Sequence, residues 1–231
     1  MREIVLDTET TGLDPQDGHR VVEIGGVELI NHIPTGRTYQ EYINPERDMP
    51  AEAEKVHGLS EAFLADKPVF AAIVEGFLAF LEEDGQGEAS PATLVIHNAS
   101  FDMKFLNFEL GQLGHARIGN DRVIDSLALA RQRFPGAPAN LDALCRRFDV
   151  DTSARTKHGA LLDSELLAEV YLGLIGGRQP GLDLAIDRQS GRATTARERT
   201  RREPRPHAPT PAELEAHQTF LQQIKGPLWL R

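Results

Sequence analysis

The sequence lacks the cysteine pairs and long apolar segments that characterise several large classes of protein. It contains a single cysteine, Cys145, among 231 residues, so it cannot form an internal disulfide. No apolar run approaches membrane-spanning length, and the amino-terminal MREIVLDTE has no basic segment leading to an apolar signal core. We therefore expect a soluble, cytoplasmic protein with no membrane partner, in which Cys145 is a buried small residue.

Positive charge is also scarce over most of the chain. The formal net charge is -10 and is unevenly distributed: residues 1–175 carry -14 (15 Lys and Arg against 29 Asp and Glu), whereas residues 176–231 carry +4 (10 against 6). Affinity for a long phosphate backbone comes largely from Lys and Arg that displace counterions. If nucleic acid is the substrate, cations or partner proteins must therefore assist its binding.

The sequence does contain an alternation of strand-like and helix-like segments. Short apolar or β-rich runs predict strands at 4–6, 21–29, 38–43, 93–97 and 123–125. Apolar residues at helical spacing predict helices at 69–82, 100–113, 126–133, 141–148 and 160–174. Short connections indicate that the first three strands are antiparallel, whereas the later alternation of strand and helix indicates a parallel portion. The fold class is therefore α/β.

The carboxy-terminal part of the chain has a different composition. Large apolar residues are almost absent from 185–209, which predicts a flexible basic linker. After it, Thr210-Pro211-Ala212-Glu213 has the pattern of a capping box that opens a helix. This terminal segment is too small to form its own core, and its apolar residues include Leu214, Leu221, Ile224 and Trp229.

Two carboxylates, Asp7 and Glu9, follow the first predicted strand. Side chains two residues apart in a strand lie on the same face, roughly 6 to 7 Å apart. Because like charges repel, most strongly beside a core, this pair favours a hard cation such as Mg²⁺ or Mn²⁺ between them. The D-x-E pattern alone is more typical of a solvated strand end than of a metal site.

Two later segments each combine a histidine with an aspartate. In H-N-A-S-F-D, Asp102 is expected in the first turn of a helix, where negative charge is favourable in any case. Within this segment His97 is typical of a core histidine and Asn98 of a helix-capping residue. In H-G-A-L-L-D, His158 lies in a loop and Asp163 one turn into the last helix of the body.

Together, the three motifs resemble those of the DEDD superfamily of 3′-5′ exonucleases, in its His-containing (DEDDh) branch. Order, spacing and predicted element types agree from Ile4 to about Leu174. The stretches D-T-E-T-T-G-L and V-H-G-L are most similar to the proofreading epsilon-subunit family of bacterial replicative polymerases. The resemblance implies a ribonuclease H-like fold with a five-stranded mixed sheet flanked by helices. It also implies hydrolysis of DNA 3′ ends to 5′-monophosphates.

The resemblance further implies roles for individual residues. Four carboxylates would hold two divalent ions, Mg²⁺ or Mn²⁺: Asp7, Glu9, Asp102 and Asp163. His158 would act as general base, a task suited to a group that titrates near neutrality. Contacts with the terminal nucleotide are implied for Glu9, Thr10, Glu52 and His57. From the sequence alone, Glu52 could equally be a solvated loop acid and His57 a turn residue.

The tail resembles the partner-binding part of the same family. Residues 179–184, Q-P-G-L-D-L, resemble the Q-x-x-L-x-L peptide that binds the sliding clamp, with Gln179, Leu182 and Leu184 as its contacts. Leu214, Leu221, Ile224 and Trp229 would anchor the end of the chain to the polymerase catalytic subunit, unless the terminal helix folds back onto the exonuclease domain. Whether a small third core subunit also binds is left open. The expected division is 1–177 exonuclease domain, 178–184 clamp peptide, 185–209 linker and 210–231 polymerase anchor.

Two alternative functions are considered. A free-standing DEDDh exonuclease acting on RNA or short oligonucleotides would have no need of the clamp-like peptide and the anchored tail. A non-catalytic tether between clamp and polymerase would have no need of four intact carboxylates and His158. The sequence therefore favours a proofreading exonuclease over both.

Overall fold

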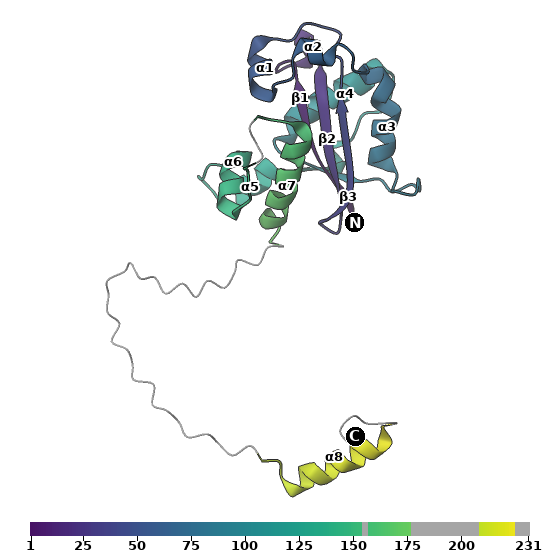
Figure 1. Ribbon diagram of the computed structural model, residues 1–231, viewed down its shortest axis with the longest axis vertical. Helices are drawn as coiled ribbons and strands as arrows, with labels where there is room; N and C mark the ends of the chain where they lie inside the picture. Colours follow the sequence, from purple (N-terminus) through teal and green to yellow (C-terminus); the bar gives the residue numbers. More distant parts are fainter. Residues whose placement is uncertain (154–156, 177–207, 225–231) are drawn as a thin grey trace, which may run out of the picture. The chain divides into compact units, whose positions relative to one another are not determined.

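A five-stranded sheet organises the first part of the chain. The computed structural model describes residues 1–153, 157–176 and 208–224, and separates the helix α8 (Pro211–Gln223) from the unit that holds the other elements. The sheet has the order β3-β2-β1-β4-β5, and its first three strands are labelled in Figure 1. Its strands are β1 (Arg2–Thr10), β2 (Val21–Ile30), β3 (Ile33–Tyr42), β4 (Thr93–Ile96) and β5 (Val123–Asp125).

The sheet is mixed, as the sequence predicts. β1 pairs antiparallel with β2 and β2 antiparallel with β3, whereas β1 and β4, and β4 and β5, are parallel. The β2-β3 hairpin turns through Asn31 and His32, which have φ of 50° and 68°, because a tight hairpin turn of this hand needs positive φ. The parallel pairs are joined by connections that contain helices, as parallel strands require.

Helices cover both faces of the sheet (Figure 1). Those of the first unit are α1 (Ala51–His57), α2 (Glu61–Leu64), α3 (Phe70–Glu82), α4 (Ala99–Gln112), α5 (Ser126–Arg133), α6 (Leu141–Phe148) and α7 (Ala160–Leu174). The sequence predicts the last five within one or two residues at each end. It misses α1 and α2, since these helices are short and largely exposed and so have no continuous apolar stripe.

Alternate residues of β1 face two separate cores. Ile4 and Leu6 pack into the core formed with α3 and α4, and Val5 packs into the core formed with α5, α6 and α7. All three side chains are fully buried, which confirms a strand covered on both faces. Cys145 lies in the second core, also fully buried, as expected.

β1 is longer than the sequence predicts, and this changes the position of the first two carboxylates. The strand continues to Thr10, so Asp7 and Glu9 lie within it, opposite Gly25 and Glu23 of β2, rather than after its end. β3 likewise starts at Ile33 instead of residue 38. In both cases pairing with β2 extends the strand into sequence that is not apolar enough to predict it.

The second described unit is α8. Its capping box is present, with reciprocal hydrogen bonds between Thr210 and Glu213, which confirms the predicted helix start. Leu221 is buried, whereas Leu214 and Ile224 are exposed. The clamp peptide with Gln179, Leu182 and Leu184, the linker 185–209 and Trp229 lie outside the described residues. Within the part of the chain that is described, no helix has the length and apolar character needed to cross a membrane.

Candidate active site

Three elements bring the four predicted carboxylates to one region. β1 carries Asp7 and Glu9, the first turn of α4 carries Asp102, and the first turn of α7 carries Asp163. Thr8, between the first two, donates hydrogen bonds from its backbone N (3.1 Å) and its Oγ1 (2.7 Å) to Asp102 Oδ1. This pair of bonds fixes α4 against β1.

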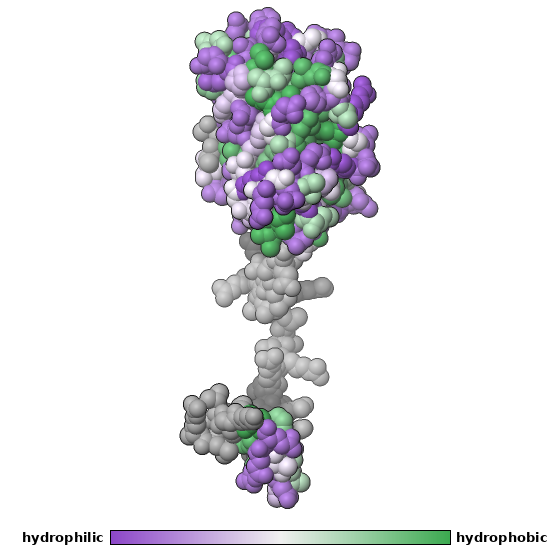
Figure 2. Space-filling view, turned by 90° about the vertical axis from the view of Figure 1, so that its right-hand side faces the viewer, coloured by the Kyte–Doolittle hydropathy of each residue, from purple (hydrophilic) through white to green (hydrophobic). Residues whose placement is uncertain are grey.

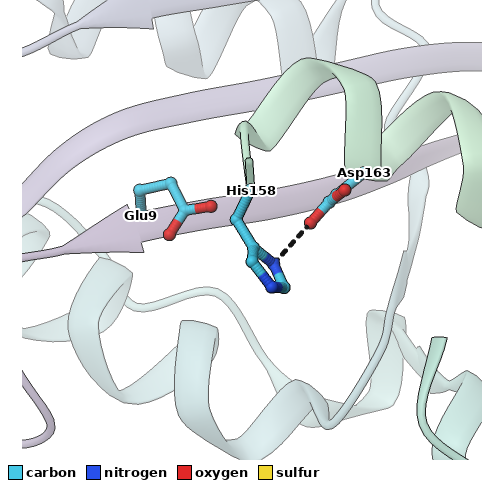
Figure 3. Close-up of side chains that lie close together, drawn as sticks. All are labelled: Glu9, His158 and Asp163. Atoms are coloured by element: carbon cyan, nitrogen blue, oxygen red, sulfur yellow. Dashed lines mark hydrogen bonds and ion pairs between the residues drawn. The ribbon is translucent and has the colours of Figure 1, made fainter. Parts of the chain in front are cut away.

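His158 lies beside two of these carboxylates. Its Nδ1 is 3.0 Å from Asp163 Oδ2, and Glu9, His158 and Asp163 each offer a ligand atom within 4.8 Å of the others (Figure 3). The backbone N of His158 donates to the carbonyl of Val56 at 3.3 Å, which links its loop to α1. The imidazole is half exposed, with 49% of its side-chain surface accessible, whereas Asp163 is buried. A titratable group here can reach both the buried carboxylates and solvent.

The electrostatics of the cluster favour a bound cation. Burial raises the pKa of Asp7 well above its usual value, and Asp102, Glu9 and Asp163 raise it further by repulsion. Burial also raises the pKa of Asp102 to about 7, against the opposing effect of the Thr8 hydrogen bonds. Such a group of carboxylates can all be ionised together only if positive charge is supplied. Carboxylate oxygens are the ligands that Mg²⁺ and Mn²⁺ prefer, so the donor set fits divalent ions.

A cavity of about 580 Å³ adjoins the cluster, and Glu9 belongs both to the cluster and to the cavity wall. This volume is within the range typical of small-molecule sites and is large enough for a nucleotide. Its wall includes Thr8 to Asp14, Asp17, His19, Pro50, Glu52, Ala53, Val56, His57 and Phe101. Glu9 is one of the four residues expected to contact a terminal nucleotide, and the other three, Thr10, Glu52 and His57, line the same cavity.

The three cavity residues are held differently. His57 is buried at the end of α1, and its Nδ1 accepts the N–H of Leu59 at 3.0 Å, which makes Nε2 the protonated nitrogen. Burial lowers the pKa of His57, so the neutral ring is favoured. Thr10 Oγ1 donates to the carbonyl of Gly12 at 2.6 Å within the loop after β1. Glu52 is exposed and belongs to α1, not to a loop.

Of two polar residues that follow β4, one departs from expectation and the other agrees with it. Asn98 occupies the N-cap of α4, but its side chain makes no capping hydrogen bond. The capping prediction for Asn98 is therefore wrong: the residue has φ of 64° and its backbone N donates to Asp125 Oδ1 at 3.1 Å. His97 Nδ1 lies 2.9 Å from Ser126 Oγ, in agreement with a satisfied histidine in the structural part of the fold.

The sequence reasoning missed one acid of this region, Glu23. It is buried, lies opposite Glu9 in the β1-β2 register, and accepts the N–H of Ala160 at the start of α7. A signal was present in the sequence, because Glu23 interrupts the apolar strand V-V-E-I. The missed cavity residues Leu13 and His19 had no comparable signal, since the loop that holds them has no periodic pattern.

Comparison with known proteins identifies the family. The family model described as Exonuclease (RNase_T) matches residues 4–171. DNA polymerase III subunit epsilon of Rickettsia felis is 48% identical over 230 residues, covering 97% of each chain. The same subunit of Escherichia coli K12 is 41% identical over 236 residues, covering 97% of this chain and 93% of the relative.

Solved structures share the fold. The nuclease domain of 3′hExo, a DEDDh family member bound to rAMP, has a TM-score of 0.64 at 18% identity, covering 76% of this chain and 92% of that one. Exonuclease X in complex with 5′ overhanging duplex DNA has a TM-score of 0.56 at 23% identity, covering 75% and 91%. These likenesses confirm the ribonuclease H-like exonuclease fold. With the family match and the identities above, they show that the chain belongs to the exonuclease family and, within it, to the DNA polymerase III epsilon subunits.

Proposed function

We propose that the chain proofreads for a bacterial replicative DNA polymerase by removing mispaired 3′-terminal nucleotides as 5′-monophosphates. The 3′-5′ exonuclease activity follows from the family to which it belongs. The observation that supports the proposed chemistry is the cluster of buried carboxylates with His158 beside a nucleotide-sized cavity.

Exonucleases of this family act with divalent metal ions, and we assign two of them, Mg²⁺ or Mn²⁺, to this cluster. The proposed ligands are Asp7, Glu9, Asp102 and Asp163. The raised pKa values of Asp7 and Asp102 support the assignment, since repulsion of this kind is relieved by bound cations. When bound, such ions would neutralise phosphate charge and stabilise the attacking and leaving oxygens of phosphodiester hydrolysis.

The proposed general base is His158. If its Nδ1 carries the proton and donates to Asp163, its Nε2 is the unprotonated nitrogen that would take a proton from the attacking water. The carboxylate then has a second task, which is to hold the imidazole in the correct tautomer and orientation. The exposed side of the ring would pass the proton to solvent after each turnover.

The cavity is the proposed site of the terminal nucleotide. His57 would donate from Nε2, and Thr10 and Glu52 would contact the sugar and the edge of the nucleotide. A cavity of this size accepts one nucleotide, so a paired end must first separate, and a mispaired end separates at lower cost. Equal rates on paired and mispaired ends would contradict this account of selectivity.

The partners are proposed from the tail and from the relatives, which are named as subunits of DNA polymerase III. We assign residues 210–231, with Leu214, Leu221, Ile224 and Trp229, to the polymerase catalytic subunit. We assign Gln179, Leu182 and Leu184 to the sliding clamp. Replacing these three with alanine should abolish binding to purified clamp, and unchanged binding would rule out the clamp assignment. The match over 97% of the chain, tail included, favours a polymerase subunit over a free-standing exonuclease.

The first experiment is release of 5′-mononucleotides from a DNA primer with a mispaired 3′ end. Wild type should release them with Mg²⁺ or Mn²⁺ and not with EDTA, whereas Asp7→Ala should release none. Asp48→Ala is the matched control, because that side chain is 84% exposed and should leave the rate unchanged. No release from folded wild type, even with polymerase and clamp present, would favour the tether.

A further inference from the structure

Glu23 is an acid in a strand of the core, and the proposed mechanism gives it no task. Only 2% of its surface is accessible. Its Oε1 accepts a hydrogen bond from Gln40 Nε2 of β3 at 2.9 Å, and its Oε2 accepts one from the backbone N of Ala160 at 3.1 Å. The carboxylate therefore connects the edge of the sheet to the first residue of α7.

The first turn of α7 lies directly against β2. A Cβ added at Gly25 would lie 2.1 Å from Ala160 C and 2.1 Å from Leu161 N, so only glycine leaves room for the helix backbone. Ser164 Oγ donates to the carbonyl of Gly25 at 3.1 Å. Strand and helix are thus joined by backbone contact, a hydroxyl and the Glu23 carboxylate within one turn.

This turn carries two proposed active-site residues. His158 precedes Ala160 by two residues, and Asp163 follows it by three. The first N–H groups of any helix need acceptors from outside it, and the N-cap residue of α7, Gly159, has no side chain to supply one. Glu23 supplies that acceptor from a neighbouring strand, with the negative charge that a helix N-terminus favours.

Placing an acid here is electrostatically unfavourable. Burial raises the pKa of Glu23, repulsion by Asp163 adds to this, and Glu23 in turn raises the pKa of Asp7. A neutral or apolar residue would avoid that repulsion. The hydrogen bonds that Glu23 accepts offset this unfavourable repulsion.

We propose that Glu23 is a positioning residue of the active site, whose carboxylate fixes the first turn of α7 to β2 and so sets the distance of His158 and Asp163 from Glu9 on β1. The proposal rests on the roles proposed above for His158 and Asp163. The remainder of α7 is held independently by Leu167 and Val170 in the core, so loss of Glu23 loosens the first turn and leaves the helix in place.

The test compares Glu23→Ala with Glu23→Gln in the full chain, with kcat and KM measured on a single-stranded oligonucleotide with Mg²⁺. A displacement of about 1 Å can cost on the order of 100-fold in rate, so Glu23→Ala should lower kcat by roughly 10-fold or more with little change in KM. Glu23→Gln keeps an oxygen that can accept the Ala160 N–H and should recover most of the loss. Glu41→Ala, on the neighbouring strand β3, is the control.

A second measurement keeps the test independent of activity. Amide hydrogen exchange at Ala160 and Leu161 should be faster in Glu23→Ala than in wild type and near normal in Glu23→Gln. If Glu23→Ala does not fold, Gln40→Ala removes the donor to Oε1, together with a bond to Tyr42 Oη, and should show the same changes on a smaller scale.

Unchanged kcat in Glu23→Ala, or equal defects in the two Glu23 variants, would overturn the proposal, and so would unchanged exchange in folded Gln40→Ala. If instead Asp7→Ala kept full activity, the proposed function would fail, whereas the exchange data would still report the contact between Glu23 and α7.

Discussion

The pKa values of individual aspartates in this protein shift in opposite directions, because their neighbours differ. Asp14 is partly exposed, and hydrogen bonds from the Gln16 backbone and from Lys104 lower its pKa. Asp7 is enclosed among other carboxylates, and burial raises its pKa well above the usual value. Asp102 lies between these cases, since two bonds from Thr8 offset part of its burial. The ability to bind a cation is therefore a property of the cluster and not of any one aspartate.

His158→Ala should lower the rate of nucleotide release at neutral pH by about 100-fold or more, in the range typical of a lost general base. The Mg²⁺ affinity of His158→Ala should differ from that of wild type much less than the affinity of Asp7→Ala does, because His158 is not a proposed ligand. Single-turnover rates and metal titrations separate the two effects.

His115→Ala is the matched control for His158→Ala. This ring is also partly exposed, at 27%, and its nearest acid is Glu75 at 3.7 Å, outside the site. Near-full activity of His158→Ala, alongside an inactive Asp7→Ala, would remove His158 from the mechanism.

Metal stabilisation should increase with pH. The pKa of Asp102 is raised from 3.8 to about 7, so without metal the folded state binds this proton more tightly than the unfolded state. Its contribution to stability is therefore present below about pH 4 and is lost as pH rises toward 7. Divalent ions bind the ionised form, so the gap in Tm between Mg²⁺ and EDTA should widen from pH 5.5 to 8.

Asp102→Asn serves as the comparison for this pH dependence. The variant has no proton to lose at this position, so its Tm in EDTA should fall less with rising pH than that of wild type. A Tm gap that stays constant over this pH range in wild type would contradict the predicted linkage.

Among the secondary-structure elements, α7 packs with its backbone directly against β2. The strand contains two adjacent glycines, Gly25 and Gly26, although glycine in a strand interior is normally unfavourable. The structure supplies the reason on each face. A Cβ at Gly25 would collide with the backbone of α7, and one at Gly26 would lie 2.9 Å from Phe80 Cε1 of α3. The low strand propensity of these two glycines is therefore tolerated, because the absence of a side chain allows a helix to pack closely against each face of the sheet.

Gly25→Ala should destabilise the protein by about 1 to 3 kcal/mol or more, because the added methyl group overpacks against backbone that cannot rotate away. Nucleotide release should fall as well, since the displaced turn carries His158 and Asp163. Thermal or urea unfolding measures the first effect and the oligonucleotide assay the second.

Gly76→Ala provides the opposite control for Gly25→Ala. Gly76 lies in α3 with nothing within 4 Å of an added Cβ, so alanine there should raise stability by about 0.5 to 1 kcal/mol. If Gly25→Ala were as stable as wild type, this result would contradict the close packing of α7 against β2.

Over the full length of the chain, charge and exposed apolar residues are distributed unevenly between the first unit and the tail. Figure 2 shows one face of the molecule, on which polar surface is interspersed with apolar areas. Residues 1–175 are strongly acidic and contain the proposed cation site, whereas residues 176–231 are basic. In α8, Leu214 and Phe220 are 49% and 58% exposed in the described part of the chain. This distribution agrees with an exonuclease domain that relies on cations and a tail that binds protein.

Deleting residues 210–231 should abolish co-purification with the polymerase catalytic subunit. The rate on a free oligonucleotide should stay within about twofold of wild type, because the proposed site lies entirely within the unit that ends before α8. Retained co-purification, or loss of activity on free oligonucleotide, would contradict the proposed division of labour. Leu214→Ala with Phe220→Ala tests the same surface without shortening the chain.

The sequence was sufficient to predict most element types, the mixed sheet and the residues that could carry the chemistry. It could do so because apolar periodicity, helix capping and paired acids are local patterns, as Ile4, Thr210 and Asp7 illustrate. The family resemblance carried the prediction further, to a ribonuclease H-like exonuclease.

Features that depend on contacts between distant segments are visible only in the folded chain. β1 extends to Thr10 because β2 pairs with it throughout, and α1 forms the wall of a cavity although its sequence has no apolar stripe. Glu23 is 137 residues from Ala160 in sequence yet accepts its N–H, so no window of sequence contains both. Hydrophobic pattern sets which face of an element is buried, whereas the position of each element against its neighbours depends on close packing and on hydrogen bonds across the fold.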